Sequence, residues 1–418
     1  MLMGALNDWR EVRLEDVCER ITVGHVGSMA NEYVSEGVPF LRSQNITPFK
    51  VDLRDVKYIT SEFNEKLKKS ALKPGDVAVV RTGYPGTAAV IPRALMVSNC
   101  SDLVIIRPGE EIDSWFLSCL FNSVWGKSMV AGNLVGVAQQ HFNVGAAKNL
   151  RIRLPPIQIQ QTIASILRNY DDLIENNTRR IEILEEMARR LYEEWFVQFR
   201  FPGHEGVGFK ESELGLIPEG WKVSALDEFG EIITGKTPSK NKSEFFGGDF
   251  PFIKLPDMHG NTFIIETTEK LSQEGVGSQK TKTIPPGSIC VSCIGTAGVV
   301  VITSEPSQTN QQINSIVPRA PELREFLFFA ATSLKGKINS YGATGATMTN
   351  LSRGKFSSLQ LVEPKEDLLC GYSKLVAPFF DKILCLQKTN RNLRAQRDLL
   401  LPRLISGEID VSDVPMPT

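Results

Sequence analysis

Residues 160–199 read QQTIASILRNYDDLIENNTRRIEILEEMARRLYEEWFVQF and contain neither proline nor glycine. Apolar side chains recur along this stretch at alternating steps of four and three residues, which is the spacing of a helix that packs on another helix. Residues 383–404 repeat this spacing near the C-terminus. One long amphipathic helix cannot bury its apolar stripe alone. The sequence therefore predicts that the two helices pair as an antiparallel coiled coil.

The predicted seam between the two helices is mostly apolar. Its residues are Tyr170, Ile174, Ile181, Leu184, Leu191, Trp195, Ile383, Leu386, Leu393 and Leu400. Asn177 and Asn390 share the same spacing, and a polar seam residue can fix register and orientation at some cost in stability. The alternative is that each stripe packs on its own globular neighbour. The two asparagines favour the coiled coil.

The rest of the chain repeats one plan at an interval of about 210 residues. The interval from Trp9 to Trp221 recurs unchanged from Pro39 to Pro251, from Pro74 to Pro286 and from Gly83 to Gly295. We call this constant spacing the repeat interval. Later pairs, such as Gly126 with Gly336, depart from it only slightly. This regularity indicates a degenerate tandem duplication.

Each copy begins with short β-like runs separated by Gly and Pro and ends in a long helix. Strands are predicted at 77–80, 88–91, 103–106, 289–293 and 299–302, with shorter helices at 114–121 and 322–332. The expected fold class is α+β, with two β-rich globular domains alternating with the two paired helices in a pseudo-two-fold repeat. The expected segments are a first domain at 1–155, a helix at 156–200, a linker at 201–214, a second domain at 215–364, a helix at 365–407 and a tail at 408–418.

The charge balance is nearly neutral, because 47 Lys and Arg face 48 Asp and Glu. This argues against a strongly basic nucleic-acid binder. Residues 1–155 carry 18 basic and 16 acidic groups, whereas residues 382–403 carry six and one. The sequence shows no signal peptide and no span of about 20 apolar residues, and its seven scattered cysteines form no disulfide framework. We expect a cytoplasmic protein that does not contact a membrane.

Motifs for catalysis are weak. Residues 230–237, GEIITGKT, match the phosphate loop G-x-x-x-x-G-K-[ST]. That loop needs a preceding strand and a following helix, whereas Ile232 and Ile233 themselves look like a strand and Pro238 continues as a turn. A nucleotide-binding enzyme that uses Lys236 stays the alternative. Cys290 and Cys293 lie in a predicted strand, where their side chains point to opposite faces, so we expect no metal site.

The order of these features resembles the specificity subunit of type I restriction–modification systems. The turn at 235–238, GKTP, resembles the Gly-x-Thr-Pro turn of that family. PGDV at 74–77 with GYPG at 83–86, and PGSI at 286–289 with GTAG at 295–298, resemble its central segment. LPP at 154–156 followed by QQTIA at 160–164 resembles the start of its first conserved helix. The second copy departs at 362–365, VEPK, where this last signature is lost.

The resemblance implies a chain that reads DNA and does no covalent chemistry itself. Each globular domain would recognise one half of a bipartite site in double-stranded DNA, and the helices would fix the spacer. Two methyltransferase subunits would dock on the helices, and two restriction and motor subunits would join them. S-adenosylmethionine, ATP and Mg²⁺ would belong to those partners, with no cofactor and no metal in this chain. An assembly scaffold without DNA contact is a further alternative.

Candidate DNA-contacting residues combine hydrogen-bond donors with a flexible backbone, because Gln and Asn read adenine and Arg reads guanine in the major groove. They are Arg42, Ser43, Gln44, Asn45, Arg81, Thr82, Tyr84, Gln139, Gln140 and His141 in the first copy, and Lys254, Thr296, Asn310, Gln311, Gln312, Thr347 and Asn350 in the second. For each residue the alternative is an ordinary role in a turn or a surface loop. The near-neutral charge predicts that the isolated chain binds DNA weakly.

Overall fold

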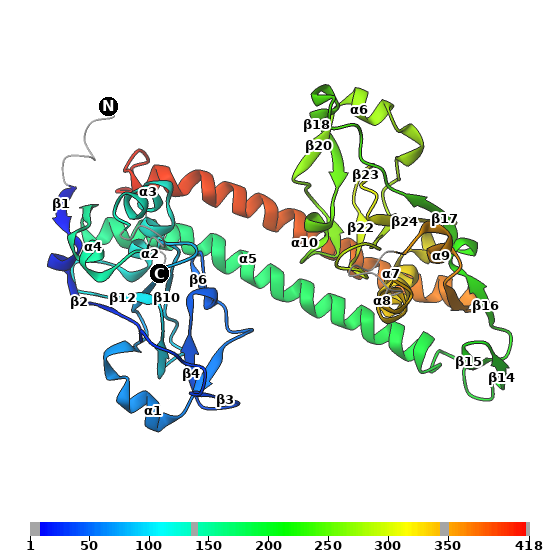
Figure 1. Cartoon of the computed structure of the whole chain (residues 1–418), viewed down its shortest axis with the longest axis horizontal. Helices are drawn as coiled ribbons and strands as arrows, with labels where there is room; N and C mark the ends of the chain where they lie inside the picture. Colours follow the sequence, from blue (N-terminus) through cyan, green and yellow to red (C-terminus); the bar gives the residue numbers. More distant parts are fainter. Residues whose placement is uncertain (1–8, 135–140, 343–350, 415–418) are drawn as a thin grey trace. The chain divides into compact units, whose positions relative to one another are not determined.

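The computed structural model describes residues 9–134, 141–342 and 351–414. The chain divides into two compact units. Unit 1 comprises Met1–Ile174 and Leu393–Thr418, and unit 2 comprises Glu175–Asn392. Two long helices, α5 (Ile157–Tyr192) and α10 (Glu366–Ile405), each contribute residues to both units (Figure 1). In the described part of the chain, no helix combines the length and apolarity needed to cross a membrane.

Unit 1 is built on two sheets. A four-stranded antiparallel sheet has the order β10-β9-β12-β2, and a five-stranded sheet has the order β3-β7-β4-β11-β8, with β11 parallel to β4. The strands of these sheets are β2 (Cys18–Val23), β3 (Tyr33–Val34), β4 (Val38–Leu41), β7 (Lys57–Ile59), β8 (Ala71–Leu72), β9 (Val77–Val80), β10 (Ala88–Val90), β11 (Ser98–Cys100) and β12 (Leu103–Pro108). Two antiparallel ribbons pair β1 (Arg10–Arg13) with β13 (Arg151–Leu154) and β5 (Ile46–Thr47) with β6 (Lys50–Val51).

Four short helices complete unit 1: α1 (Ser61–Lys66), α2 (Ser114–Asn122), α3 (Val124–Gly132) and α4 (Val144–Asn149). Each begins after a polar residue whose side chain accepts a hydrogen bond from the first turn, as helix N-termini require. These caps are Thr60, Asp113, Ser123 and Asn143. Helix α2 packs against β9 and β10, and all four residues of β9 are buried.

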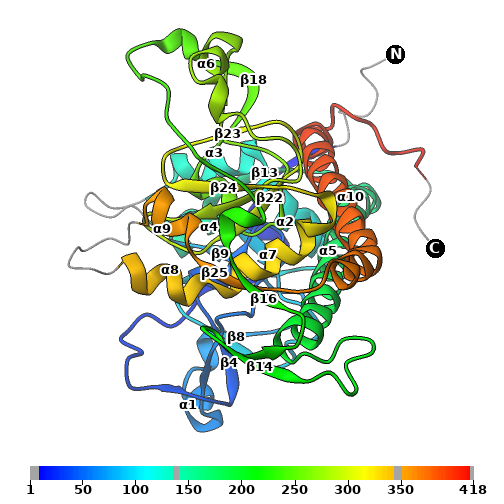
Figure 2. The same cartoon turned by 90° about the vertical axis from the view of Figure 1, so that its right-hand side faces the viewer.

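Unit 2 repeats this arrangement (Figure 2). Its main sheet has the order β17-β24-β21-β22-β19, and a three-stranded sheet has the order β20-β18-β23. These strands are β17 (Gly230–Thr234), β18 (Phe246–Ile253), β19 (Phe263–Ile264), β20 (Glu269–Leu271), β21 (Ile289–Ser292), β22 (Val300–Thr303), β23 (Gln308–Thr309) and β24 (Ile313–Pro318). Two ribbons pair β14 (Phe209–Ser212) with β15 (Gly215–Pro218) and β16 (Lys222–Ala225) with β25 (Gln360–Glu363). The short helices are α6 (Gln273–Gly277), α7 (Arg324–Ser333), α8 (Lys335–Gly342) and α9 (Arg353–Ser357), and α7 packs against β21 and β22.

The duplication read from the sequence is present in the elements themselves. The repeat interval separates the first residues of β9 and β21, of β10 and β22, and of α1 and α6. From β11 onward the spacing becomes slightly shorter, as the starts of β11 and β23 and then of α5 and α10 show. The predicted strands and short helices are confirmed within about two residues, as expected for element boundaries. The α+β repeat with two long helices is confirmed as well.

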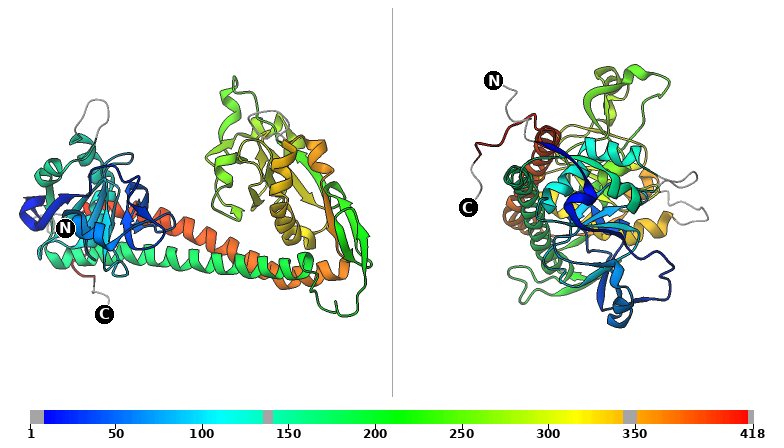
Figure 3. Two further views of the ribbon diagram at one scale, coloured as in Figure 1. Left: turned by 60° about the horizontal axis from the view of Figure 1, so that its bottom comes forward. Right: turned by 90° about the vertical axis from the view of Figure 1, so that its left-hand side faces the viewer.

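The paired helices contact each other antiparallel in each unit (Figure 3). In unit 2, the Asn177 Nδ2 donates to the Asn390 Oδ1 at 3.0 Å, and the Tyr372 hydroxyl donates to the Ala188 carbonyl at 3.3 Å. In unit 1, the Arg397 Nη1 lies 2.5 Å from the Asp171 Oδ1. The two pairs of unit 2 advance in opposite directions along α5 and α10, so the helices run antiparallel.

The predicted seam lies at this helix interface or at its ends. Ile174, Ile181, Trp195, Ile383 and Leu386 are buried. Tyr170, Leu184, Leu191, Leu393 and Leu400 are half-buried. The alternative packing also occurs in part, because the seam residue Trp195 belongs to the hydrophobic core of unit 2. The stripes therefore serve both the coiled coil and the globular cores.

Three local features differ from expectation. Helix α5 ends at Tyr192 and continues as a π-helical turn at Glu193–Val197, and Phe199 leaves the helix with a φ of 57°. The expected linker at 201–214 contains β14 of the β14–β15 ribbon. In the expected tail, Val411 is 3% exposed and joins the core of unit 1. Burial of Trp195, Phe196 and Val411 accompanies the first and third features, whereas β14 is largely exposed and is held by its pairing with β15.

Candidate nucleic-acid interface

The same turn carries a cation in each unit. In unit 1, the 3₁₀ turn Ser43–Asn45 follows β4, and the Arg42 amide donates to the Asn45 Oδ1 at 3.0 Å. In unit 2, the 3₁₀ turn Leu255–Met258 follows β18, and the Lys254 amide donates to the Asp257 Oδ2 at 2.9 Å. The repeat interval separates Arg42 from Lys254. The predicted candidates Arg42 and Lys254 therefore occupy equivalent positions in the two copies.

Both cations are held by carboxylates. The Arg42 Nη2 lies 3.1 Å from the Asp55 Oδ2, and the Gln44 Nε2 donates to the same oxygen at 2.5 Å. Lys254 forms an ion pair with Glu269. The hydrogen bond from Arg42 lowers the pKa of Asp55, so this carboxylate stays ionised at neutral pH. A phosphate or a base edge would have to compete with these carboxylates for the same donors.

A second carboxylate gathers three further candidates of unit 1. Asp102 has a φ of 53° at the start of β12. Its Oδ1 lies 3.6 Å from the Arg81 Nη1, its carboxylate accepts a hydrogen bond from Thr82, and its carbonyl accepts one from the Ser43 Oγ at 3.2 Å. The structure thus brings together Ser43 and the pair Arg81 and Thr82, which are far apart in the sequence.

Other candidates in unit 1 have distinct environments. Asn45 is 1% exposed and its Nδ2 donates to the Asp52 carbonyl at 3.0 Å, so it stabilises the turn. Tyr84, at the tip of its loop, is 83% exposed. His141 lies beside Arg81 in the fold, since the amide of the following Phe142 donates to the Arg81 carbonyl at 3.1 Å. Gln139 and Gln140 lie outside the described residues, as do Thr347 and Asn350 of unit 2.

The candidates of unit 2 converge around one segment, Asn310 to Gln312. The Asn310 Nδ2 donates to the Gln312 Oε1 at 2.9 Å, and the Gln312 carbonyl accepts from the Cys293 amide at 2.7 Å. This second bond joins the segment to the loop that carries the exposed Thr296. Gln311 is exposed, and its Oε1 accepts from the Thr237 Oγ1 at 2.6 Å. Polar side chains from three loops therefore lie together here.

The apparent phosphate loop belongs to this cluster and lacks the geometry of a nucleotide site. Residues Gly230–Thr234 form β17, and no helix follows before Phe246 in this described stretch except a single 3₁₀ turn at Ser243–Phe245. The Gly235 amide donates to the Ile313 carbonyl at 3.1 Å and the Lys236 amide to the Thr309 carbonyl at 2.9 Å. A Cβ at Gly235 would lie 2.1 Å from the Asn310 carbonyl oxygen. The amides that a phosphate requires are thus committed to the sheet edge.

The cysteine pair shows no metal chemistry. Cys290 and Cys293 belong to separate hydrophobic clusters of unit 2, as the alternation of a strand predicts. Burial raises the pKa of the Cys290 thiol to about 12 and that of Cys293 to about 11, so both are neutral. Among the residues that the structure describes, no three His, Cys, Asp or Glu side chains form a cluster suited to a metal ion.

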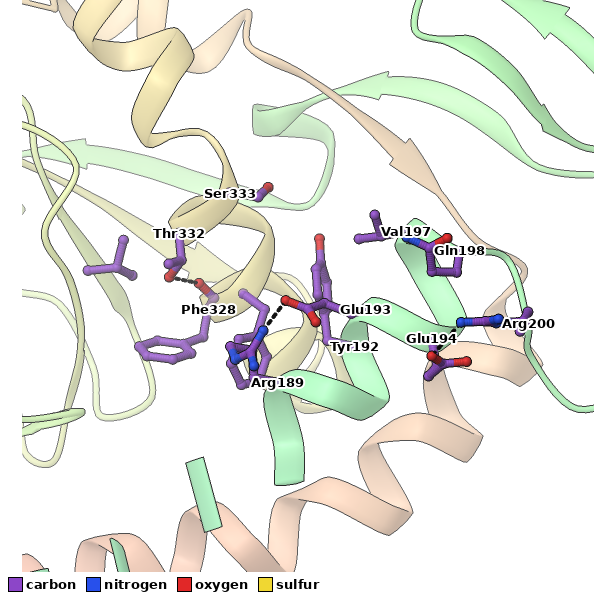
Figure 4. Close-up of a pocket in the computed structure, with 12 residues that line it drawn as sticks. Arg189, Tyr192, Glu193, Glu194, Val197, Gln198, Arg200, Phe328, Thr332 and Ser333 are labelled. Atoms are coloured by element: carbon purple, nitrogen blue, oxygen red, sulfur yellow. Dashed lines mark hydrogen bonds and ion pairs between the residues drawn. The ribbon is translucent and has the colours of Figure 1, made fainter. Parts of the chain in front are cut away.

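A separate hollow of about 690 Å³ lies in unit 2 where α5 ends against α7 (Figure 4). Its charged lining is paired internally: Arg189 contacts Glu193, and the Arg200 Nη2 lies 2.6 Å from the Glu194 Oε1. Burial raises the pKa of Tyr192, also in the lining, to about 12. Paired charges and a neutral phenol give this hollow no reactive group.

The side chains that contact the candidate residues and that sequence reasoning missed are Asp55, Asp102, Glu269 and Thr237. The repeat gives no signal for Asp102, because Asp102 lies directly before β12, whereas the polar Asn314 lies inside the equivalent strand β24. Asn314 is buried in that strand, and its Oδ1 accepts from the Thr234 Oγ1 at 2.6 Å. The partners Asp55 and Glu269 do not share the repeat interval, so only the structure reveals them.

Comparison with known proteins identifies the family. The model of the type I restriction modification DNA specificity domain matches residues 7–186 and again 218–367, one match for each copy. The HindI specificity subunit of a type I restriction enzyme from Haemophilus influenzae is 31% identical, over 97% of this chain and all of that protein. The MjaIX specificity subunit from Methanocaldococcus jannaschii is 22% identical, over 97% of this chain and 95% of that protein.

A solved structure supports the same fold. The specificity subunit of a type I restriction–modification system from M. genitalium superposes with a TM-score of 0.63 at 14% identity, covering 97% of this chain and 98% of that one. Together, the duplicated units, the paired helices and the two family matches show that the chain belongs to the type I restriction–modification DNA specificity family.

Proposed function

We propose that this chain is the sequence-reading subunit of a type I restriction–modification complex, in which each unit reads one half of a bipartite DNA site. The observation that carries the proposal is the duplication: the same turn with a cation, Arg42 or Lys254, recurs at the repeat interval on the same sheet scaffold. Two copies of one reading device match a DNA site made of two blocks. Family membership supports this assignment.

The helix pair would set the distance between the two blocks. Helix α5 has 36 residues and α10 has 40, so each is about 55–60 Å long at about 1.5 Å per residue. This length corresponds to between one and two turns of B-DNA, each about 34–36 Å. The Asn177–Asn390 hydrogen bond fixes the register of the pair. A fixed register would give a fixed spacer.

The catalytic chemistry would come from partner subunits. We infer that two methyltransferase subunits, supplied with S-adenosylmethionine, dock on the helices, and that two ATP- and Mg²⁺-dependent restriction subunits complete the assembly in the cytoplasm. This chain would bind none of these cofactors. The pairing of Arg42 and Lys254 with carboxylates leaves little free positive charge for phosphate at the two turns. The purified chain is therefore expected to bind DNA weakly, and its partners would supply much of the grip.

Footprinting of the reconstituted complex tests the proposal. The complex of this chain with its methyltransferase subunits is expected to protect two short blocks separated by an unprotected spacer of constant length. A single protected block, or no sequence preference, would refute bipartite reading. Strong, salt-sensitive DNA binding by the chain alone would refute the inferred dependence on partners.

The alternative of a nucleotide-binding enzyme has its own test. We expect neither the wild-type chain nor the Lys236→Ala variant to bind ATP, so the substitution should leave nucleotide binding unchanged. Equilibrium dialysis against labelled ATP makes this measurement. ATP binding that Lys236→Ala abolishes would favour the enzyme over the reader.

A further inference from the structure

We propose that in each unit one loop clamps the reading turn, which is Ser43–Asn45 in unit 1 and Leu255–Met258 in unit 2, to the helix pair. In unit 1 this clamp is the contact of the Phe49 ring with Arg397. The proposal rests on the proposed function, since it assigns positioning residues for the reading turns. It concerns how a globular reading surface is held at a defined place on the helices.

The reading turn of unit 1 continues directly into the β5–β6 hairpin. The Asp52 amide donates to the Asn45 carbonyl at 2.8 Å, and the Asn45 Nδ2 donates back to the Asp52 carbonyl at 3.0 Å. Phe49 lies at the tip of this hairpin and is 6% exposed. Any shift of the hairpin tip is therefore transmitted through two hydrogen bonds to the turn that carries Arg42 and Gln44.

Phe49 has an unusual backbone that its ring contact explains. Its φ is 68°, in the left-handed region where a tight turn normally uses glycine. A bulky residue in this region costs free energy and persists only where its surroundings hold it. The Arg397 guanidinium carbon lies 4.9 Å from the centre of the Phe49 ring, a cation–π contact.

Arg397 joins the ring to both helices. It lies on the seam of α10, and its Nη1 is 2.5 Å from the Asp171 Oδ1 of α5. The two side chains are only 14% and 19% exposed. One planar guanidinium thus contacts an aromatic ring on its face and a carboxylate at its edge, which Arg can do and Lys cannot.

Unit 2 makes an equivalent contact with different chemistry. By the repeat interval, Asn261 is the residue of the second copy that is equivalent to Phe49. Asn261 directly follows Gly260, whose φ is 82°. Beside it, Thr262 forms a hydrogen bond with Glu185 of α5, and the Phe263 amide donates to the Gln387 Oε1 of α10 at 3.2 Å. The loop after the reading turn therefore contacts α10 in each unit; in unit 2 it also contacts α5 directly, and in unit 1 it is linked to α5 through the Arg397–Asp171 ion pair. A recurrence in two diverged copies argues for a shared role in positioning.

The test uses the reconstituted methyltransferase complex and three variants. Phe49→Gly removes the ring while favouring the left-handed backbone, Phe49→Tyr keeps the ring, and Arg397→Lys keeps the charge but removes the flat stacking surface. Methylation rates are measured on the recognised site, and on sites with single base changes in one block or the other. The melting temperature of each complex is recorded in parallel.

Phe49→Gly and Arg397→Lys are each expected to reduce discrimination in one block by roughly tenfold, about the effect of one lost base contact. The other block, read by unit 2, keeps its discrimination, and Phe49→Tyr behaves as wild type. The double variant should lose no more than either single one, because both remove the same contact. Arg397→Lys provides the measurement if Phe49→Gly does not assemble.

Equal loss of discrimination in both blocks, or unchanged discrimination in both variants, would overturn the clamp. A wild-type complex that recognises no two-block site would instead overturn the proposed function. The two failures are distinguishable because the second is seen before any variant is made.

Discussion

The C-terminal ends of the two long helices occupy equivalent positions in the repeat, but they contribute different side chains to the cores of their units. In unit 2, the end of α5 and the π-helical turn after it carry Tyr192, Trp195 and Phe196. In unit 1 the equivalent positions at the end of α10 are Leu401, Leu404 and Ile405. The Phe196 ring centre lies 4.9 Å from that of Tyr372 and 5.0 Å from that of Phe326. The end of α10 instead contributes aliphatic side chains to the core of unit 1.

The comparison shows which parts of the duplicated plan are constrained. The turns, strands and helix starts keep their spacing, while the side chains that fill the two cores have diverged. Cores accept such changes because packing depends on total volume and apolarity more than on identity. The reading turns likewise keep their backbone and exchange Arg42 for Lys254.

The largest expected effect comes from truncating the two helix ends. Phe196 and Ile405 are both 6% exposed, so Phe196→Ala and Ile405→Ala form a matched pair. We expect unit 2 to lose about 4 kcal/mol with the first and unit 1 about 3 kcal/mol with the second, because Phe196 also loses aromatic contacts. Amide hydrogen exchange of β21–β24 and of β9–β12 reports each unit separately. If Phe196→Ala lowered protection equally in both units, the separate cores would be refuted.

The next effect concerns the polar layer of the helix pair, which is an ion pair in unit 1 and an amide pair in unit 2. Asp171→Ala leaves Arg397 partly buried without its main carboxylate and should cost about 3 kcal/mol. Asn177→Ala leaves the buried Asn390 amide without one partner and should cost about 1–2 kcal/mol. Urea unfolding measures both losses.

Leucine at both positions provides the control for the amide pair. The double variant Asn177→Leu with Asn390→Leu is expected to be more stable than Asn177→Ala, since it leaves no buried polar group at either position. It should also relax the spacer length that the complex accepts. A spacer preference as strict as that of wild type would contradict a register role for the asparagines.

A smaller effect is expected from the carboxylates that hold the reading cations. Asp55→Asn weakens the hold on Arg42 and Gln44, so non-specific DNA affinity of the complex should rise and its dependence on log salt should steepen by about one. Glu269→Gln is the matched change at Lys254 in unit 2. Fluorescence anisotropy across a salt series makes the measurement. An unchanged slope in both variants would mean that neither cation reaches phosphate.

The smallest effect is a pH dependence located in unit 2. Burial raises the pKa of Glu185, which accepts a hydrogen bond from Thr262. The folded protein therefore binds the proton of Glu185 more tightly than the unfolded chain does. As a consequence, the free energy of unfolding falls as the pH rises from the ordinary glutamate pKa of 4.5 through the raised pKa of the folded protein. Glu185→Gln should remove that fall and gain stability relative to wild type above this window. Thermal melts across the pH range test it, and parallel curves for the two proteins would contradict the assignment.

Much of the fold could be predicted because its signals are periodic. The heptad spacing indicated the helix pair and its two seam asparagines, which the Asn177–Asn390 hydrogen bond confirms, and the repeat interval indicated the two units. Helix α10 nevertheless runs through Pro378, which sequence rules treat as a helix breaker. Packing of Tyr372, Val376 and Phe380 into the core of unit 2 maintains it.

The candidate site could be predicted only in part. Arg42, Arg81 and Lys254 were proposed because donors follow strands in both copies, and their role in DNA contact stays a prediction. Their carboxylate partners, such as Asp102 for Arg81, come from loops whose approach depends on the tertiary fold. The contact of Phe49 with Arg397 joins residues near opposite ends of the sequence, which no local pattern reveals.

The central claim is that two homologous units on one helix pair read two separate blocks of DNA. Selection of binding sequences from a fully randomised DNA pool by the reconstituted complex tests it most directly. The account predicts that the enriched sequences contain two short conserved blocks separated by a spacer of constant length and variable sequence. A single contiguous block, or two blocks at variable spacing, would contradict it.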